Sequence, residues 1–403
     1  MSRPTPGRAR RARLLALVSL AAACAHVPHR SPLPEGHVAD AEVLGIPRAR
    51  VWGDAPPPDE SEWMAQSRAE LKARYPEIYG RRHTYLAISG GGQQGIFAAG
   101  LLLGWTEAGN RPEFTTVTGV SSGALIAPFA FLGPEYDAQL RKVSAELTAH
   151  NLYKRRRTIR ALRTDAMATT EPLQALIAKY VDEEMMERIA VEHRKGRSLN
   201  IGTTNLDSMR PVTWRIGEIA SSGHPGALKL IRQILLASAS VPAAFPPVLI
   251  EVEAAGHSYD ELHVDGGATS QVFLYPIGLD YDEVLKRLAV PGRPKVYIIR
   301  NARLEPIYEQ VENKLVPIAG RSIDSLVRTQ GIGDLYRIYF ATCRDGLDFN
   351  LASIPDEFTE TPREEVDPEY MRKLFDMACD LAKAGYPWEK MPPGLKTAPV
   401  RCP

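Results

Sequence analysis

The chain is long and its charge is balanced. It has 403 residues, of which 44% are hydrophobic, so it can bury one large core or two ordinary ones. It carries 49 basic residues against 48 acidic ones, which excludes binding to nucleic acid through an overall positive charge. Its histidines are scattered and its four cysteines lie far apart, so the sequence predicts no metal site.

Residues 1–23 predict a signal peptide. Five arginines and no acidic residue precede or flank a short apolar run, residues 14–23, which is too short to span a bilayer. Cys24 follows directly, and small residues before a cysteine resemble a bacterial lipoprotein signal, although Ala21 stands where leucine is usual. Alternatives are an ordinary cleaved signal and a twin-arginine signal at Arg10-Arg11. We expect lipidation at Cys24 and a membrane-anchored lipoprotein of the cell envelope, facing the periplasm or located at the outer membrane.

Residues 24–80 predict a proline-rich tether followed by a short helix. Seven prolines lie between residue 25 and residue 60, which favours an extended chain. Two apolar stretches, residues 43–46 and 51–52, are candidates to dock on the body of the protein. The helix is expected over residues 62–75, ending near Pro76.

From residue 83 onward, strand patterns alternate with helix patterns. Strands are expected at residues 85–88, 115–120, 198–203, 212–216, 248–252, 262–264 and 296–300. Helices are expected at residues 96–105, 123–131, 137–148, 173–181, 185–194, 228–239, 281–288, 323–341 and 368–384. The alternation predicts an α/β fold with a largely parallel central sheet flanked by helices. Because no linker is visible, we expect one domain over residues 81–403 with a C-terminal helical extension.

A glycine-rich loop, Ser-Gly-Gly-Gly-Gln-Gln-Gly at residues 89–95, lies between a strand and a helix pattern. Its glycines can turn a group of free N–H donors toward a negative oxygen. The same loop, with glycines at 90, 92 and 95, also fits the Gly-x-Gly-x-x-Gly pattern of dinucleotide-binding proteins. Against that alternative, Glu107 and Glu113 do not end a clear second strand, where a ribose-binding acid is expected.

A second motif, Gly-Val-Ser-Ser-Gly at residues 119–123, also lies between a strand and a helix. In a Gly-x-Ser-x-Gly turn the central serine, here Ser121, is held exposed as a nucleophile. The helix that follows favours the negative charge that develops during attack. Ser122 competes for the role but is not central. A nucleophile next to an anion cradle indicates acyl transfer.

The base that activates Ser121 has one strong candidate, Asp265, which precedes two glycines at the end of a strand. A Ser-acid-His triad of the hydrolase order needs a histidine after the acid, and the last histidine is His263. Pairing of His257 or His263 with an earlier acid is one alternative, and a purely turn-forming Asp265 is another. The simplest hypothesis is that Asp265 takes the serine proton directly.

Over residues 83–277 this combination resembles the patatin-like phospholipase family of serine acyl hydrolases. The family pattern is a glycine-rich loop, a Gly-x-Ser-x-Gly turn and a distant Asp-Gly-Gly, in that order. The small, proline-containing stretch at residues 238–247 resembles the family as well. The resemblance implies a lipid or phospholipid ester substrate and no cofactor. It also implies a nucleophile, a base and an oxyanion hole, namely Ser121, Asp265 and the N–H groups of Gly90, Gly91 and Gly92.

The loop departs from the family pattern at two positions. Ser89 replaces an aspartate, and Gln94 replaces a basic residue. The backbone donors survive both changes, but the positive charge near the oxyanion does not, unless an arginine from elsewhere replaces it. Arg300-Asn301 ends a strand and is assigned either to the pocket or to local structure. Two alternative functions remain. One is nucleotide binding through the loop from Gly90 to Gly95, and the other is a non-catalytic binding role as an envelope lipoprotein on this fold.

Two further features are open at this stage. The basic run at residues 154–157, with Arg160 and Arg163, is either a solvated face or a contact for anionic lipid headgroups. An exported protein can pair two of its remaining cysteines, but the sequence does not fix which of Cys343, Cys379 and Cys402 are joined. The oligomeric state is not indicated.

Overall fold

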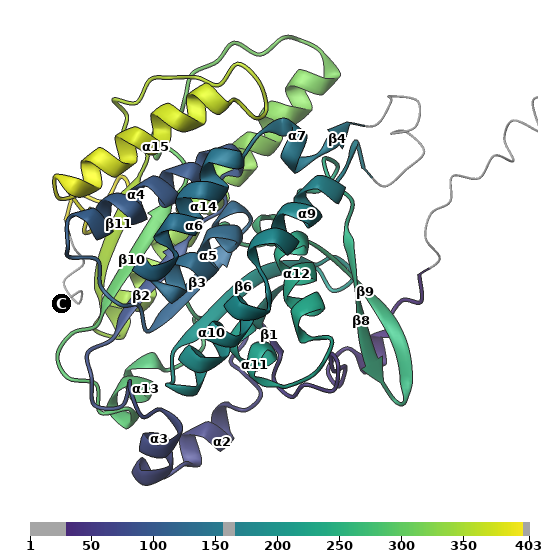
Figure 1. Ribbon diagram of the computed structural model, residues 1–403, viewed down its shortest axis with the longest axis vertical. Helices are drawn as coiled ribbons and strands as arrows, with labels where there is room; N and C mark the ends of the chain where they lie inside the picture. The colour runs from purple at the N-terminus through teal and green to yellow at the C-terminus, as the bar shows by residue number, and fades with distance from the viewer. Residues whose placement is uncertain (1–29, 156–165, 398–403) are drawn as a thin grey trace, which may run out of the picture.

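The computed structural model describes residues 30–155 and 166–397 (Figure 1). The predicted signal peptide, the lipidation site Cys24, most of the basic run and Cys402 lie outside the described residues. In the described chain, Lys154 of that run lies in a two-stranded ribbon of β4 (Lys154–Arg155) and β5 (Ala168–Thr169).

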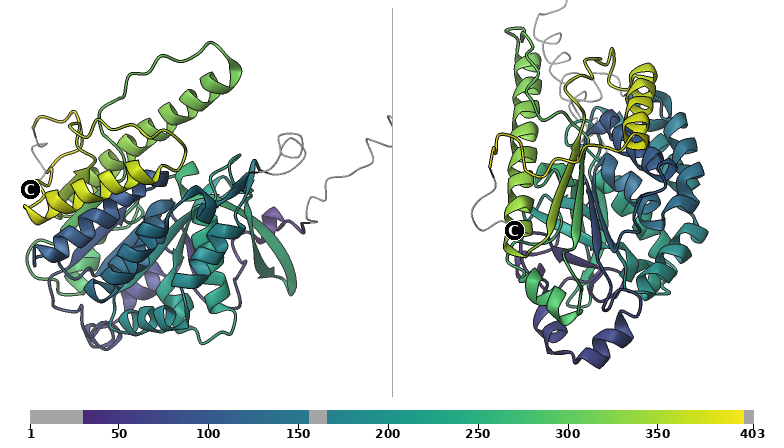
Figure 2. Two further views of the ribbon diagram at one scale, coloured as in Figure 1. Left: turned by 45° about the horizontal axis from the view of Figure 1, so that its top comes forward. Right: turned by 90° about the vertical axis from the view of Figure 1, so that its left-hand side faces the viewer.

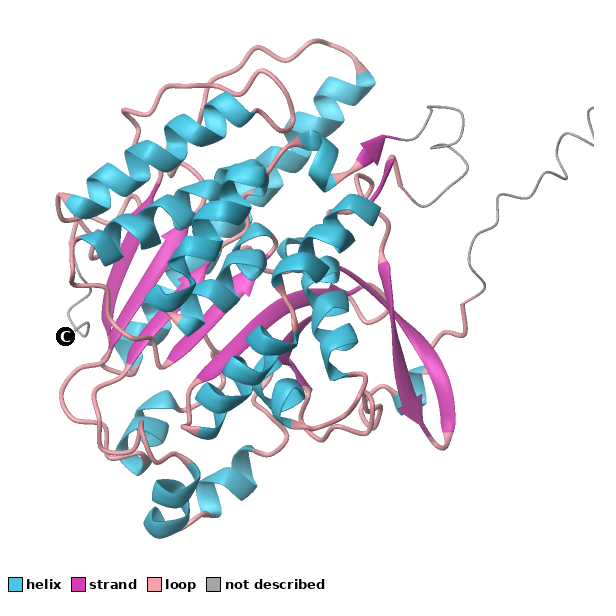
Figure 3. Cartoon of the chain, viewed as in Figure 1, coloured by secondary structure: helices cyan, strands magenta, loops and turns pink. Residues whose placement is uncertain are grey.

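A nine-stranded sheet forms the centre of the described chain (Figure 3). Five parallel strands occupy one side of it: β6 (Ser198–Asn205), β3 (Thr116–Val120), β2 (Thr84–Ile88), β10 (Lys295–Arg300) and β11 (Asp348–Ser353). Four antiparallel strands complete it: β7 (Arg210–Arg215), β1 (Arg50–Trp52) and the hairpin of β8 (Val248–Ala254) and β9 (His257–Asp265). The predicted largely parallel sheet is confirmed.

Each face of the sheet is covered by its own core, because side chains alternate along a strand. In β2, Leu86 and Ile88 enter the larger core, and Tyr85 and Ala87 enter the smaller one. Helices of the larger core are α4 (Ile96–Glu107), α5 (Ser122–Leu132), α6 (Asp137–Glu146), α9 (Glu171–Tyr180), α10 (Glu183–Arg194), α11 (Ile216–Ser221), α12 (Ala227–Ser238) and α15 (Pro368–Lys383). The smaller core is closed by α13 (Tyr281–Arg287) and α14 (Leu315–Arg344), and Figure 2 shows α14 on the face opposite most helices.

The prediction of one helix over residues 62–75 is wrong, because the chain forms two short helices there: α2 (Glu60–Ala65) and α3 (Arg68–Arg74). Ser67 lies between them and caps α3. Its hydroxyl accepts from the Glu70 N–H at 3.3 Å, and the Glu70 carboxylate accepts from the Ser67 N–H at 2.6 Å. This reciprocal capping box starts a new helix at Ser67.

The proline-rich segment is not an extended tether from residue 30 onward. Val43 and Ile46 are buried, and β1 pairs antiparallel with β7. Docking of both apolar stretches is therefore confirmed. Burial of these side chains, together with ion pairs of Arg30 to Asp207 and Arg50 to Glu261, holds the segment on the domain.

The segment after residue 301 completes the domain and is not a helical extension of it. β11, which the sequence analysis missed, adds a parallel strand beside β10, and α14 begins eight residues earlier than expected. α15 lies directly along α4 at two glycines. A Cβ at Gly104 would meet the Cys379 carbonyl oxygen at 2.1 Å, so only glycine permits this approach.

The cysteines divide into two groups. Cys379 is buried as a free thiol, whereas Cys343 is disulfide-bonded. Among residues 30–155 and 166–397, no helix has the length and apolarity that crossing a bilayer requires.

Candidate active site

Ser121 lies in a strained turn between β3 and α5. Its φ of 54° and ψ of −126° fall in a region that residues other than glycine rarely adopt. The flanking glycines are required by packing. A Cβ at Gly119 would meet the Gly123 carbonyl oxygen at 2.6 Å, and one at Gly123 would meet the Ile88 carbonyl oxygen at 2.4 Å. Close packing therefore requires glycine on both sides of Ser121, which explains the Gly-x-Ser-x-Gly pattern.

The stretch at residues 238–247 holds two turns in place. The Ser121 N–H donates to Ser238 Oγ at 3.0 Å, and Ser238 Oγ donates to the Gly202 carbonyl at 2.7 Å. Two residues later, the Ser240 carbonyl accepts the N–H of Asp265 at 2.9 Å. The buried start of this stretch, residues 238–240, therefore fixes the backbones of both Ser121 and Asp265.

Asp265 ends β9 and is 4% exposed. Its Oδ1 accepts from the Gly267 N–H at 2.7 Å, while Oδ2 makes no hydrogen bond within the described chain. Burial raises the pKa of Asp265 to about 6, although the nearby Ser121 hydroxyl and the Gly267 N–H act to lower it. The structure thus brings Ser121 and Asp265 together, and the carboxylate is ionised at neutral pH yet more basic than an ordinary aspartate.

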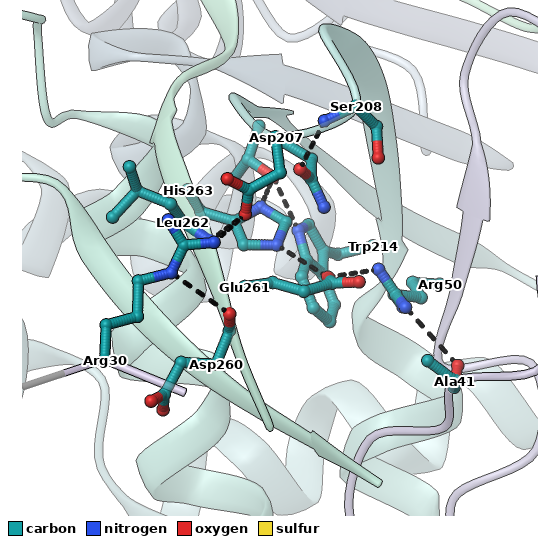
Figure 4. A network of polar contacts seen from close by, with 12 residues as sticks. Arg30, Ala41, Arg50, Asp207, Ser208, Trp214, Asp260, Glu261, Leu262 and His263 are labelled. Atoms are coloured by element: carbon teal, nitrogen blue, oxygen red, sulfur yellow. Dashed lines mark hydrogen bonds and ion pairs between the residues drawn. The ribbon is translucent and has the colours of Figure 1, made fainter. Parts of the chain in front are cut away.

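Neither His263 nor His257, the two histidines of β9, can act as a base for Ser121. His263 is fully buried, with Nδ1 3.0 Å from Thr203 Oγ1 and Nε2 3.1 Å from Glu261 Oε2 (Figure 4). His257 is exposed at the opposite end of β9 from Asp265, about 26 Å away at the rise of an extended strand. A triad built on either histidine is therefore excluded.

His263 belongs to a separate polar network, which Figure 4 shows in close-up. Glu261 forms an ion pair with Arg50 and a hydrogen bond with His263. Because Nε2 faces a carboxylate, it carries the proton, and Nδ1 accepts from the Thr203 hydroxyl. Thr203 Oγ1 in turn accepts from Trp214 Nε1 at 2.8 Å, so each of these contacts has one donor and one acceptor.

The glycine loop requires one correction to the predicted oxyanion hole. The Gly90 N–H donates to the Gln271 carbonyl at 3.1 Å, so it is not available to an oxyanion. The N–H groups of Gly91 and Gly92 have no acceptor within the described residues. A Cβ at Gly91 would meet the Asn301 carbonyl oxygen at 2.3 Å, which explains why glycine is needed there. Of the three N–H groups predicted for the oxyanion hole, those of Gly91 and Gly92 are free among the described residues and that of Gly90 is not.

A cation lies under this loop, although Gln94 does not supply it. Arg300, at the end of β10, donates through Nη1 to Ser89 Oγ at 3.2 Å and to the Gly90 carbonyl at 3.3 Å. Burial lowers the pKa of Arg300 to about 10, so it stays charged at neutral pH. Gln94 instead donates to the Tyr370 hydroxyl at 3.3 Å. The only sequence signal for Arg300 was a charged residue at the end of an apolar strand.

Helix α14 contacts Gln271 and Arg300, which in turn bind the glycine loop, and the sequence analysis did not foresee these contacts. Asp334 Oδ2 accepts from the Gln271 N–H at 2.7 Å, and Gln271 Nε2 donates to the Gly267 carbonyl at 2.8 Å. Gly331 lets the Arg300 guanidinium lie against the helix, since a Cβ there would meet Arg300 Nη2 at 2.6 Å. A helix of the smaller core therefore holds Gln271 and Arg300 in place beside the glycine loop.

An apolar cavity opens beside Ser121 and Gly92. It lies among helices of the larger core, and its apolar lining includes Ile96, Phe129, Leu140, Leu173, Ile177, Leu235, Val241 and Phe245. Such a lining suits a hydrocarbon chain and not the phosphates of a dinucleotide. The cavity therefore disfavours the nucleotide-binding alternative for the glycine loop.

Comparison with family models gives a match to this chain. Residues 86–276 match the family model described as patatin-like phospholipase, a range that contains the glycine loop, Ser121 and Asp265. Among solved structures, the chain is similar to VipD from Legionella pneumophila. The identity is 17%, the match covers 75% of this chain and 67% of that chain, and the TM-score is 0.31. A search of curated proteins gave no match.

Proposed function

Residues 86–276 of this chain are a patatin-like phospholipase domain, and from that premise we propose that the protein is a serine acyl hydrolase acting on carboxylic esters of lipids. Ser121 is the proposed nucleophile and Asp265 the proposed base. The observation that carries the proposal is the buried Asp265 carboxylate, which lies close enough to the Ser121 hydroxyl for that hydroxyl to lower its pKa.

The proposed reaction has two steps. Asp265 accepts the Ser121 proton as the serine oxygen attacks the ester carbonyl, and the tetrahedral intermediate collapses when the leaving alcohol takes that proton. Water then gives a proton to Asp265 and attacks the acyl-enzyme, which releases a fatty acid and restores Ser121. The acyl chain is proposed to lie in the apolar cavity beside Ser121, whose lining supports this assignment.

The oxyanion is proposed to bind the N–H groups of Gly91 and Gly92, with Arg300 strengthening the positive potential behind them. Arg300→Met should then lower kcat on a soluble ester by about tenfold with little change in KM, since the charge acts only when the oxyanion forms. Arg300→Lys keeps the charge and should retain more activity. If Arg300→Met kept the native kcat, Arg300 would have no role in the mechanism.

The direct test uses a fluorophosphonate probe and a short-chain nitrophenyl ester. The purified chain should become labelled at Ser121 and should hydrolyse the ester, and Ser121→Ala should do neither while keeping its melting temperature. NAD or ATP should leave the melting temperature unchanged. An unlabelled, inactive native chain would favour a non-catalytic binding protein on this fold, and a panel of defined lipids would then identify what it binds.

The location is also a proposal, motivated by residues 1–24 alone. We infer that Cys24 is lipidated and anchors the protein in the cell envelope. Cells grown with labelled palmitate should incorporate it into the native chain and not into a Cys24→Ser variant. Equal labelling of both chains, or of neither, would overturn the assignment.

A further inference from the structure

The first half of α14 exposes an apolar stripe to solvent. Its members are Leu315, Val316, Ala319, Ile323 and Leu326, and the four large ones are 84%, 79%, 59% and 70% exposed in chain order. At 3.6 residues per turn these positions fall within an arc of about 100° on one side of the helix. The stripe is therefore a continuous face, not a set of scattered residues.

Away from the stripe, both arginines of this half-helix bind the segment that precedes α14, whereas Ser322, Asp324 and Ser325 are exposed. Arg321 donates to the carbonyl of Ile307, and Arg328 donates to the carbonyl of Leu304 at 2.6 Å. The connecting segment before α14 thus lies along the charged face. It adds two more apolar side chains to the exposed surface, Tyr308 at 86% and Ile307 at 48% exposure.

The stripe adjoins the proposed active site. Four residues after Leu326, Gln330 Oε1 accepts from Gln271 Nε2 at 3.5 Å, and one turn later Asp334 holds the Gln271 backbone. Gln271 in turn accepts from Gly90 in the glycine loop. Figures 1 and 2 show this half of α14 extending beyond the carboxyl ends of the parallel strands, the edge at which the Ser121 turn lies.

We propose that the apolar stripe of α14 is the surface by which the protein docks on a lipid bilayer. The inference rests on the proposed function. A lipid ester must pass from an aggregate into the apolar cavity at Ser121, so the surface flanking that site has to contact the aggregate. The stripe carries no charged side chain, so its attraction is to the acyl region of the bilayer and not to headgroup charge.

Vesicle sedimentation tests the proposal with diether phosphatidylcholine, which an ester hydrolase cannot cleave. The chain from residue 24 with Cys24→Ser is used, so that no acyl anchor contributes. Replacing Leu315, Val316, Ile323 and Leu326 each by Gln should weaken binding by at least tenfold, since each buried apolar side chain contributes substantially to partition. Raising the salt concentration or adding anionic lipid should leave native binding nearly unchanged.

The matched control is Phe340→Gln. Phe340 is 59% exposed on the same helix, about 21 Å along the axis from Leu326 and toward the opposite edge of the sheet. Its replacement should leave vesicle binding at the native level. Native binding by the four-site variant would overturn the proposal, as would native binding that depends on anionic lipid.

Hydrolysis separates this inference from the proposed function. The four-site variant should cleave a soluble nitrophenyl ester at the native rate and ester vesicles at least tenfold more slowly. If the native chain has no esterase activity, the proposed function is wrong. The vesicle-binding experiment still tests whether the stripe binds a bilayer. If sedimentation velocity instead shows native dimers that the four-site variant cannot form, the stripe is an interface between copies of this chain.

Discussion

Strand β9 carries two buried carboxylates whose pKa values move in opposite directions. Glu261 is 1% exposed and Asp265 is 4% exposed, and both lie on the same side of the strand. Burial raises the pKa of Glu261, but the His263 hydrogen bond and the Arg50 charge outweigh it and hold the pKa below its ordinary value. Asp265 has no such cation, and burial raises its pKa to about 6.

The difference shows that burial alone does not decide the role of a carboxyl group. Glu261 Oε2 binds both Arg50 and His263, and the ion pair with Arg50 holds the N-terminal segment against the domain. Each carboxylate keeps one oxygen without a hydrogen-bond partner among the described residues, so the two differ in the cation beside Glu261 and the Ser121 hydroxyl near Asp265. The buried Arg300 contacts the glycine loop and is not among the groups that shift the pKa of Asp265. The cation beside Glu261 therefore decides that its pKa falls while that of the buried Asp265 rises.

The largest expected effect is on activity. Asp265→Asn should lower kcat/KM on a soluble ester by about 10²–10⁴-fold, because the general base is lost. Glu261→Gln, four residues away, should stay near the native rate at a temperature where both variants are folded. Equal losses in the two variants would mean that Asp265 acts through the structure of β9 and not as the base.

The next effect is on stability. Arg50→Met leaves Glu261 buried without its cation and should lower the free energy of unfolding by about 3–5 kcal/mol. Adding Glu261→Gln removes the buried charge and should restore a large part of the loss. The control is Arg210→Met, because Arg210 pairs with Asp54 at the surface, where a pair contributes about 1 kcal/mol or less. Denaturant unfolding measures the stability of all three variants. A similar small loss for Arg50→Met and Arg210→Met would show that the buried ion pair contributes no more than the surface pair.

Asp265→Asn should also stabilise the fold at pH 8. The folded-state pKa is raised from 3.8 to about 6, so the ionised carboxylate destabilises the native state above pH 6 and has no such effect below pH 3.8. Since one pKa unit corresponds to about 1.36 kcal/mol, the gain at pH 8 is on the order of 3 kcal/mol. Urea unfolding at pH 8 and pH 4 checks the sign. A destabilised Asp265→Asn at pH 8 would show that the carboxylate is held by partners as Glu261 is.

The smallest effect is on the pH dependence of the native chain. The base must be ionised, so kcat/KM should rise with pH to half its maximum near pH 6 and fall tenfold per pH unit below it. Rates on a soluble ester between pH 4.5 and pH 9 measure this limb. A midpoint near 4 would mean that burial does not control Asp265.

Local patterns in the sequence anticipated much of the fold. Alternating apolar runs located the parallel strands, and the motifs at residues 89–95, 119–123 and 265–267 identified the segments that the structure brings together. The break between α2 and α3 was missed, although Ser67 and Glu70 have the spacing of a capping box. β11 was missed because its sequence, Asp-Phe-Asn-Leu-Ala-Ser, lacks a clear apolar run.

The sequence by itself determined the turn at Ser121 and the pairing of that serine with Asp265 as candidates. Both rest on short motifs, Gly-Val-Ser-Ser-Gly and Asp-Gly-Gly, that are visible in the sequence itself. Tertiary structure decided the rest of the site. Only the packing of β10 puts the Arg300 charge under the glycine loop, and only the contact with Gln271 occupies the Gly90 N–H. These contacts join residues about 180 or more positions apart, and no local pattern records which distant group will satisfy a buried charge or N–H.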